Sequence, residues 1–128
     1  MNQEEMKERT KRFALEIIRL VESLPRTRTA DVLGGQLLRS GTSVGGNYRS
    51  ACRAKSVADF ISKMGIVEEE ADESIYWMEL LIGAKVLEPT KTESLIKEGK
   101  QLLAIAISSI KTARKNRLSS KRDLRNVS

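Results

Sequence analysis

Acidic side chains are densest in one run of the sequence, EEEADE at residues 68–73. If this run is helical, Glu69 and Glu73 share one face, because residues four apart lie one above the other. Glu68 and Asp72 share another face. Two such pairs of like charges could bind a divalent cation or shift each other's pKa. Carboxylate metal sites in helical bundles usually add a Glu-x-x-His motif, and the chain contains no histidine. We therefore expect a solvated acidic face that is matched by the cations of a neighbouring helix.

Nucleophilic catalysis has little support in this composition. Without histidine, Ser-His-Asp and Cys-His arrangements are excluded, and neither a G-x-x-x-x-G-K-[ST] loop nor a G-x-G-x-x-G fingerprint occurs. The single cysteine, Cys52, is followed closely by Arg53 and Lys55, which would lower the pKa of its thiol. Lone cysteines are mostly small core residues, so we expect Cys52 to be structural. The sequence predicts a protein that is not an enzyme and has no cofactor or metal.

The basic residues are unevenly distributed. The net charge is +6, but residues 1–110 contain equal numbers of basic and acidic residues, so the whole excess lies in residues 111–128. The cations of this C-terminal segment are Lys111, Arg114, Lys115, Arg117, Lys121, Arg122 and Arg125. Residues 32–58 of the neutral part contain no anion, and their cations are Arg39, Arg49, Arg53 and Lys55. Both groups are candidates for contacts with phosphate.

Four amphipathic segments would position these charges. Apolar residues recur at three- and four-residue steps over residues 4–24, 30–54, 56–87 and 92–117, which predicts four helices. Pro25 ends the first, Ser56 is placed to cap the third, and Pro89 follows it. Few aromatic residues and two prolines argue against an all-β fold. The expected fold is all-α, an antiparallel four-helix bundle of residues 1–117 with a basic flexible tail of residues 118–128.

The second segment contains five of the eight glycines, namely Gly34, Gly35, Gly41, Gly45 and Gly46. Each costs a helix interior roughly 0.8–1 kcal/mol relative to alanine, so propensity alone predicts a loop at SGTSVGGN. In a continuous helix, Gly41 and Gly45 would instead let another backbone approach closely. That backbone could belong to a neighbouring helix or to a nucleic acid. The residues alone leave a break at positions 41–46 open.

The fourth segment contains LLAIAISSI at residues 102–110, which is apolar on more than one face. Such a helix is buried on two sides, either at the centre of a bundle or against another subunit. The first residues, MNQEEMKERTKRF, do not form a signal peptide, and no run approaches the roughly 18 apolar residues of a membrane span. We expect a cytoplasmic protein without a membrane partner.

Two stretches, LLRSGTSVGGNYR at residues 37–49 and YWMELL at residues 76–81, make the chain resemble the four helix bundle protein family, also called the 23S rRNA intervening-sequence protein family. The resemblance covers residues 13–110. It implies an up-down bundle with a continuous second helix, assembled as a ring-shaped homo-oligomer in which a pentamer is expected. A more distant resemblance is to the accessory variability determinant of diversity-generating retroelements, a basic pentameric barrel that binds nucleic acid and a reverse transcriptase.

The resemblance also implies roles for two polar residues. The family has a glutamate before its Tyr-Trp pair and an asparagine in its second helix, which match Glu73 and Asn47 here. Both lie beside the apolar seam, where a polar group needs a partner. We predict that both are structural, with Glu73 accepting hydrogen bonds from Arg39, Arg49 or a backbone group.

Two functions of different classes follow. In the first, an oligomeric module binds nucleic acid, with RNA favoured, through the basic C-terminal segment and the second-helix arginines Arg39, Arg49 and Arg53. In the second, the protein is a scaffold for a protein partner such as a reverse transcriptase, and the interface candidates are Tyr48, Tyr76 and Trp77. The salt dependence of binding distinguishes the two functions, because phosphate binding weakens steeply as the salt concentration rises and apolar docking does not.

Overall fold

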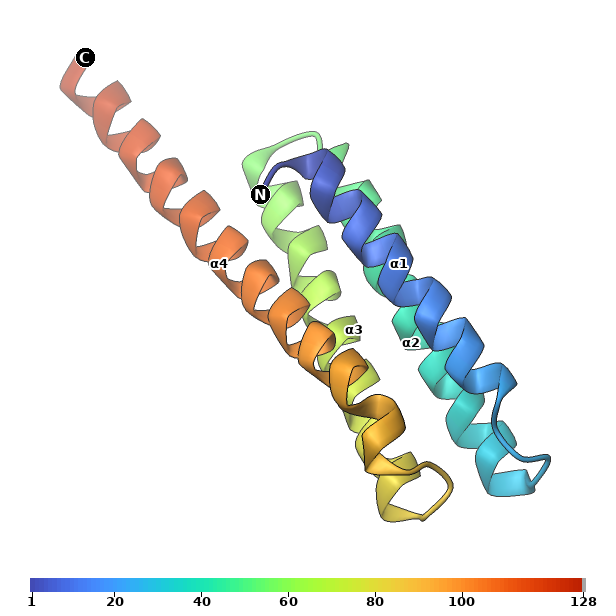
Figure 1. The fold of residues 1–128 in the computed structure, drawn as a ribbon. Coiled ribbons are helices and arrows are strands. Elements are labelled where there is room, and N and C mark those ends of the chain that lie inside the picture. Colours follow the sequence, from blue (N-terminus) through green and yellow to red (C-terminus); the bar gives the residue numbers. More distant parts are fainter. Residues whose placement is uncertain (128) are drawn as a thin grey trace.

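The structure is a computed structural model that describes residues 1–127, with side chains described for residues 1–121. Four helices follow one another: α1 (Gln3–Glu22), α2 (Arg28–Cys52), α3 (Val57–Gly83) and α4 (Pro89–Val127). Successive helices run in opposite directions, and the described residues contain no strand (Figure 1). The fold is the all-helical four-helix bundle expected from the sequence.

The core is a seam of apolar side chains drawn from every helix. Its largest fully buried members are Phe13 and Ile17 of α1, Leu37 and Val44 of α2, Met64, Val67, Met78 and Leu81 of α3, and Leu102 of α4. Helix α3 packs against both α2 and α4, α1 packs mainly on α2, and α1 meets α4 over a shorter stretch. The bundle is therefore held together chiefly through α2 and α3.

An ion pair joins α1 to α4. The guanidinium of Arg9 donates from Nε to Oε2 of Glu98 and from Nη2 to Oε1, each at 2.7 Å, and Gln101 also accepts from Arg9. Both partners of the pair are partly buried. Bidentate pairs of this kind fix geometry as well as adding energy, so this contact sets how the two helices lie side by side.

Helix α2 is continuous through all its glycines, which decides between the two alternatives left open by the sequence. A methyl group added at Gly41 would lie 2.8 Å from both Cγ1 and Cγ2 of Ile17 on α1. One added at Gly45 would lie 3.1 Å from Oγ1 of Thr10. The approaching backbone is therefore that of α1, and the contact energy of this close packing offsets the poor helix propensity of glycine.

Local signals explain the ends of α3. Oγ of Ser56 accepts a hydrogen bond from the amide of Asp59 at 3.0 Å, so Ser56 is the N-cap that the sequence predicts. The helix ends at Gly83 instead of continuing to residue 87, because Lys85 adopts a left-handed conformation with φ of 60°. The amides of Val86 and Leu87 then donate to the carbonyl of Leu81 and close the helix end.

Helix α4 is longer than the sequence analysis predicts. It begins at Pro89, since proline suits the first helical position, and it continues to Val127. Its 39 residues span about 58 Å. The predicted helix end at Arg117 is therefore wrong, and residues 118–127 are helical where a tail without regular structure was expected. Residues 100–127 contain no glycine or proline to end a helix. Within residues 1–127, no helix combines the length and the apolar character needed to cross a membrane.

Candidate nucleic-acid interface

Cations from three helices gather around a hollow at one end of the bundle. This basic hollow has a volume of about 470 Å³ and is lined by Lys7, Gly46, Arg49, Ser50, Arg53, Lys55 and Lys63. The antiparallel order explains the gathering, because the start of α1, the end of α2 and the start of α3 lie together at this end (Figure 1). Arg49 lies in the last turn of α2, and Arg53 is the residue that directly follows the helix.

The charges in the basic hollow are only partly balanced. Nζ of Lys7 lies 3.3 Å from Oε1 of Glu4, and Nζ of Lys63 lies 2.9 Å from Oδ2 of Asp59. The hydrogen bond from Lys63 lowers the pKa of Asp59, and so does the bond from the Lys55 amide. Arg49, Arg53 and Lys55 form no ion pair with any described side chain. A net positive charge therefore remains at this end of the bundle.

Gly46 exposes the α2 backbone in the lining of the basic hollow. A methyl group added there would have no neighbour within 4 Å, in contrast to Gly41 and Gly45, which are packed against α1. The α2 backbone is therefore open between Arg49 and the start of α1. Of the two alternatives for Gly41 and Gly45, a neighbouring helix or a nucleic acid, the structure shows the neighbouring helix.

The C-terminal part of α4 continues past the same end of the bundle. We call residues 111–127 the α4 extension; its cations Lys111, Arg114, Lys115, Arg117 and Lys121 are all exposed. The predicted contacts Arg122 and Arg125 lie outside the residues with described side chains. The extension leaves the bundle at the end where α2 connects to α3 (Figure 1). Ala113 and Asn116 line a depression there together with Cys52 and Lys55. Lys55 also lines the basic hollow, so it lies between the hollow and the base of the extension.

Arg39 is separate from the other predicted contacts. Its Nη1 lies 3.0 Å from Oε2 of Glu70, and its Nη2 lies 2.8 Å from Oε1 of Glu73. Glu73 thus pairs with Arg39, one of the three donors that the sequence allowed. Arg39 is ten residues before Arg49, about 15 Å along α2. The structure does not bring Arg39 to the basic hollow, and two carboxylates already offset its charge.

The acidic run of α3 lies beside this pair. Partial burial raises the pKa of Glu70 above its ordinary value, and the charge of Arg39 opposes that rise. In the core, the buried hydroxyl of Ser74 on α3 donates a hydrogen bond to the hydroxyl of Ser40 on α2 at 3.0 Å. The described residues contain no group of three or more acidic or cysteine side chains suited to one metal ion. Within the acidic run, Glu70 and Glu73 balance the charge of Arg39 on α2.

The remaining predicted residues have different surroundings. Nδ2 of Asn47 donates to the Ser43 carbonyl of its own helix at 2.8 Å. Tyr48 is buried, and burial raises the pKa of its hydroxyl, with a hydrogen bond to Cys52 adding to the effect. Buried in the core, Tyr48 does not offer an exposed docking surface. Tyr76 is exposed and makes an edge contact with Trp77, with ring centroids 5.2 Å apart.

Sequence reasoning missed Lys7 and Lys63 as members of the basic hollow. Each pairs with an acid on its own helix, so the sequence shows only balanced charge at these positions. The available signal was topological, because antiparallel order brings residues near the start of α1 and α3 to the end of α2.

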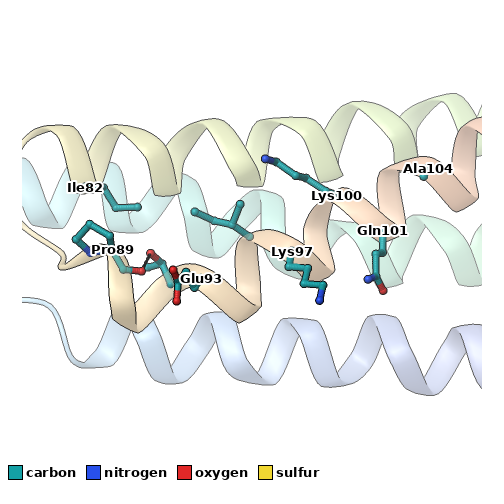
Figure 2. Close-up of a pocket in the computed structure, with 9 residues that line it drawn as sticks. Ile82, Pro89, Glu93, Lys97, Lys100, Gln101 and Ala104 are labelled. Carbon is teal, nitrogen blue, oxygen red and sulfur yellow. Dashed lines mark hydrogen bonds between the residues drawn. The ribbon is translucent and has the colours of Figure 1, made fainter.

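An apolar groove lies toward the opposite end of the bundle. It has a volume of about 520 Å³, and Ile82 of α3 lines it with Pro89, Ile96 and Ala104 of α4. Figure 2 shows Ile82 and Pro89 at one end of this groove and Ala104 at the other, with the side chains of Lys97 and Lys100 between them. Helix α4 thus keeps apolar surface outside the core.

Comparison with known proteins identifies a family and a solved structure similar to the chain. A family model described as 23S rRNA-intervening sequence protein matches residues 2–108. A crystal structure of a protein with unknown function from the S23 ribosomal protein family of Bacteroides thetaiotaomicron is 39% identical, with a TM-score of 0.77. That alignment covers 82% of this chain and 97% of the other. No curated protein matches the chain. The basic hollow lies within the family match, whereas the α4 extension lies beyond it.

Proposed function

Because the chain belongs to the 23S rRNA-intervening sequence protein family, we propose that it is a non-enzymatic, oligomeric module that binds nucleic acid through its basic end. The observation that carries this proposal is the basic hollow, where Arg49, Arg53 and Lys55 have no anionic partner among the described side chains. The family's name connects it with 23S rRNA, so RNA is the favoured ligand.

Counterion release supplies the driving force in this proposal. Each cation that contacts a phosphate releases a condensed counterion, so affinity falls steeply as salt rises. The cations are held on helix ends that the bundle fixes relative to one another, which lowers the cost of ordering them on binding. The exposed cations of the α4 extension add further contacts at the same end.

Assembly is the second part of the proposal. Several copies, expected as a ring of five, would present their basic ends together and gain avidity from linked weak contacts. The apolar surface that α4 keeps at Ile96, Ala104 and neighbouring positions supports a contact between copies. Light scattering at several protein concentrations measures the assembled mass, and a monomer at all concentrations would contradict this part.

The test of binding uses structured RNA at several salt concentrations. We expect the full chain to bind with a steep salt dependence, and the Arg49→Gln/Arg53→Gln variant to bind more weakly. The slope of log affinity against log salt should flatten by about 0.9 for each duplex phosphate that the variant no longer neutralises. The matched control is Arg26→Gln/Arg28→Gln, which removes the same charge from exposed positions at the opposite end.

The two variants give a clear decision. Equal weakening by both would mean that overall charge, and not the basic hollow, controls binding. No binding by the intact assembly at low salt would overturn the proposal and favour the protein scaffold.

A specific observation supports the second function, a scaffold for a protein partner: Tyr76 is exposed beside Trp77, and the buried Nε1 of Trp77 has no described hydrogen-bond acceptor. The exposed Tyr76 ring would be the apolar contact with a partner, and such docking would be insensitive to salt.

A further inference from the structure

The α4 extension separates its charged and neutral residues onto different sides. At 100° per residue, the exposed cations of residues 111–121 fall within about 160° of the helix circumference. These cations are Lys111, Arg114, Lys115, Arg117 and Lys121. The other side contains Thr112, Ala113, Asn116, Ser119 and Ser120. The extension is thus a continuous helix with one basic side and one neutral, mostly polar side.

The polar side argues against a membrane or a buried helical partner. An amphipathic helix that binds lipid needs an apolar face opposite its cations, and this helix has hydroxyl and amide groups there. Among residues 111–121, the one exposed large apolar side chain is Leu118, which lies among the cations. The basic side is therefore the binding surface, and its chemistry fits a row of anions.

The lack of aromatic residues narrows the class of nucleic acid. Proteins that bind single strands stack the exposed bases on aromatic side chains. The lining of the basic hollow has no aromatic residue, and neither do residues 111–128. Stacked bases inside a double helix need no such platform, because the phosphates alone face the protein.

We propose that the ligand of the basic end is double-helical nucleic acid, held through its phosphates with the α4 extension lying as a preformed helix against a groove. This inference rests on the proposed function and deepens it. From Lys111 to Lys121 the basic side extends about 15 Å. A helix about 10–12 Å across fits the major groove of B-DNA, which is about 12 Å wide, or lies over the wide minor groove of an RNA duplex. The basic hollow contacts neighbouring phosphates at the base of the extension.

The helical state of the extension can be tested without changing its charge. Ser119 is exposed on the neutral side, beyond the contacts with the bundle. Ser119→Pro removes a backbone donor and clashes with the preceding turn, so it breaks the helix between Lys115 and Lys121. Ser119→Ala is the matched control, because alanine favours the helix. Circular dichroism and light scattering check that the bundle and its assembly are unchanged in both variants.

Binding is measured with an RNA duplex, a DNA duplex and a single-stranded homopolymer of matched phosphate number at one salt concentration. We expect the full chain to prefer the duplexes, and Ser119→Pro to bind them about tenfold more weakly than Ser119→Ala, since several residues must be ordered again on binding. The ranking of the two duplexes then distinguishes RNA from DNA.

Two results would overturn the inference while leaving the proposed function standing. The first is equally tight binding of the single strand. The second is equal duplex affinity of Ser119→Pro and Ser119→Ala, which would mean that the extension acts as a flexible chain of charges. Failure of the full chain to bind any of the three probes would instead remove the proposed function itself.

Discussion

Replacing Gly41 with alanine tests whether close packing of α1 on α2 is the reason for glycine in the middle of a helix. The added methyl group would lie 2.8 Å from Cγ1 and Cγ2 of Ile17 and 3.1 Å from its Cβ. Ile17 is fully buried, and its Cβ is fixed to the α1 backbone, so it cannot turn away. Either the two helices separate or Ile17 leaves its preferred rotamer.

The magnitude follows from two opposing effects on the free energy of unfolding. Alanine gains about 0.8–1 kcal/mol over glycine in a helix interior. Extra methyl groups in a close-packed core cost about 1–3 kcal/mol. At Gly41 both effects act, and full burial of Ile17 favours a net loss of about 1–2 kcal/mol. At Gly35 a methyl group would have no neighbour within 4 Å, so only the gain applies.

The assay is urea unfolding of both variants at one protein concentration, with the assembled mass checked because oligomers unfold in a concentration-dependent way. We expect Gly35→Ala to raise the free energy of unfolding and Gly41→Ala to lower it. The same substitution in the same helix would then act with opposite sign. If Gly41→Ala stabilises the protein as much as Gly35→Ala, the packing argument is refuted.

Three smaller effects follow from the helix surfaces. Glu73→Ala should lower the free energy of unfolding by up to about 1 kcal/mol, because the pair with Arg39 is partly exposed, and so lower the melting temperature; an unchanged melting temperature would contradict its structural role. The pKa of Glu70 is raised, so the folded state binds the proton of this carboxyl more tightly than the unfolded state does. The free energy of unfolding should therefore fall as pH rises above 4.5, the ordinary value for this group. Glu70→Gln should remove this fall from the free energy of unfolding measured as a function of pH. Lys85→Gly should stabilise the protein by about 1 kcal/mol because φ is 60°, whereas Ala84→Gly, at φ of −79°, should not.

Periodicity was sufficient to predict the four helices and their antiparallel order, since each buries one apolar side. Periodicity was not sufficient at α2. There the low helix propensity of glycine favours a break, but packing of the glycines against α1 keeps the helix continuous. The contact depends on Ile17 and Thr10, which lie far from the glycines in sequence. Only the matched family motif, and not the local residues, gave the continuous helix.

The end of α4 shows the opposite failure. Loss of the apolar pattern after residue 117 predicted a flexible tail, but a helix outside the core needs no apolar stripe. Its residues need only adequate helix propensity and no glycine or proline, and the arginine, lysine and leucine residues of this segment have high helix propensity. Cations near a helix C-terminus also interact favourably with the helix dipole.

The neutrality of residues 1–110 conceals the charge of the basic end, because Glu4 and Asp59 balance only part of it and other acids lie farther away. Glu70 and Glu73 lie beside Arg39 in the middle of the bundle. Glu70 is seven residues after Lys63 on α3, about 10 Å along the helix, and charges at such a distance are largely screened at physiological salt, where the Debye length is about 8 Å. A phosphate in the basic hollow would therefore experience Arg49 and Arg53 with little repulsion from the acidic centre. The same separation explains why Arg39 is paired with two carboxylates whereas Arg49 and Arg53 form no ion pair with a described side chain.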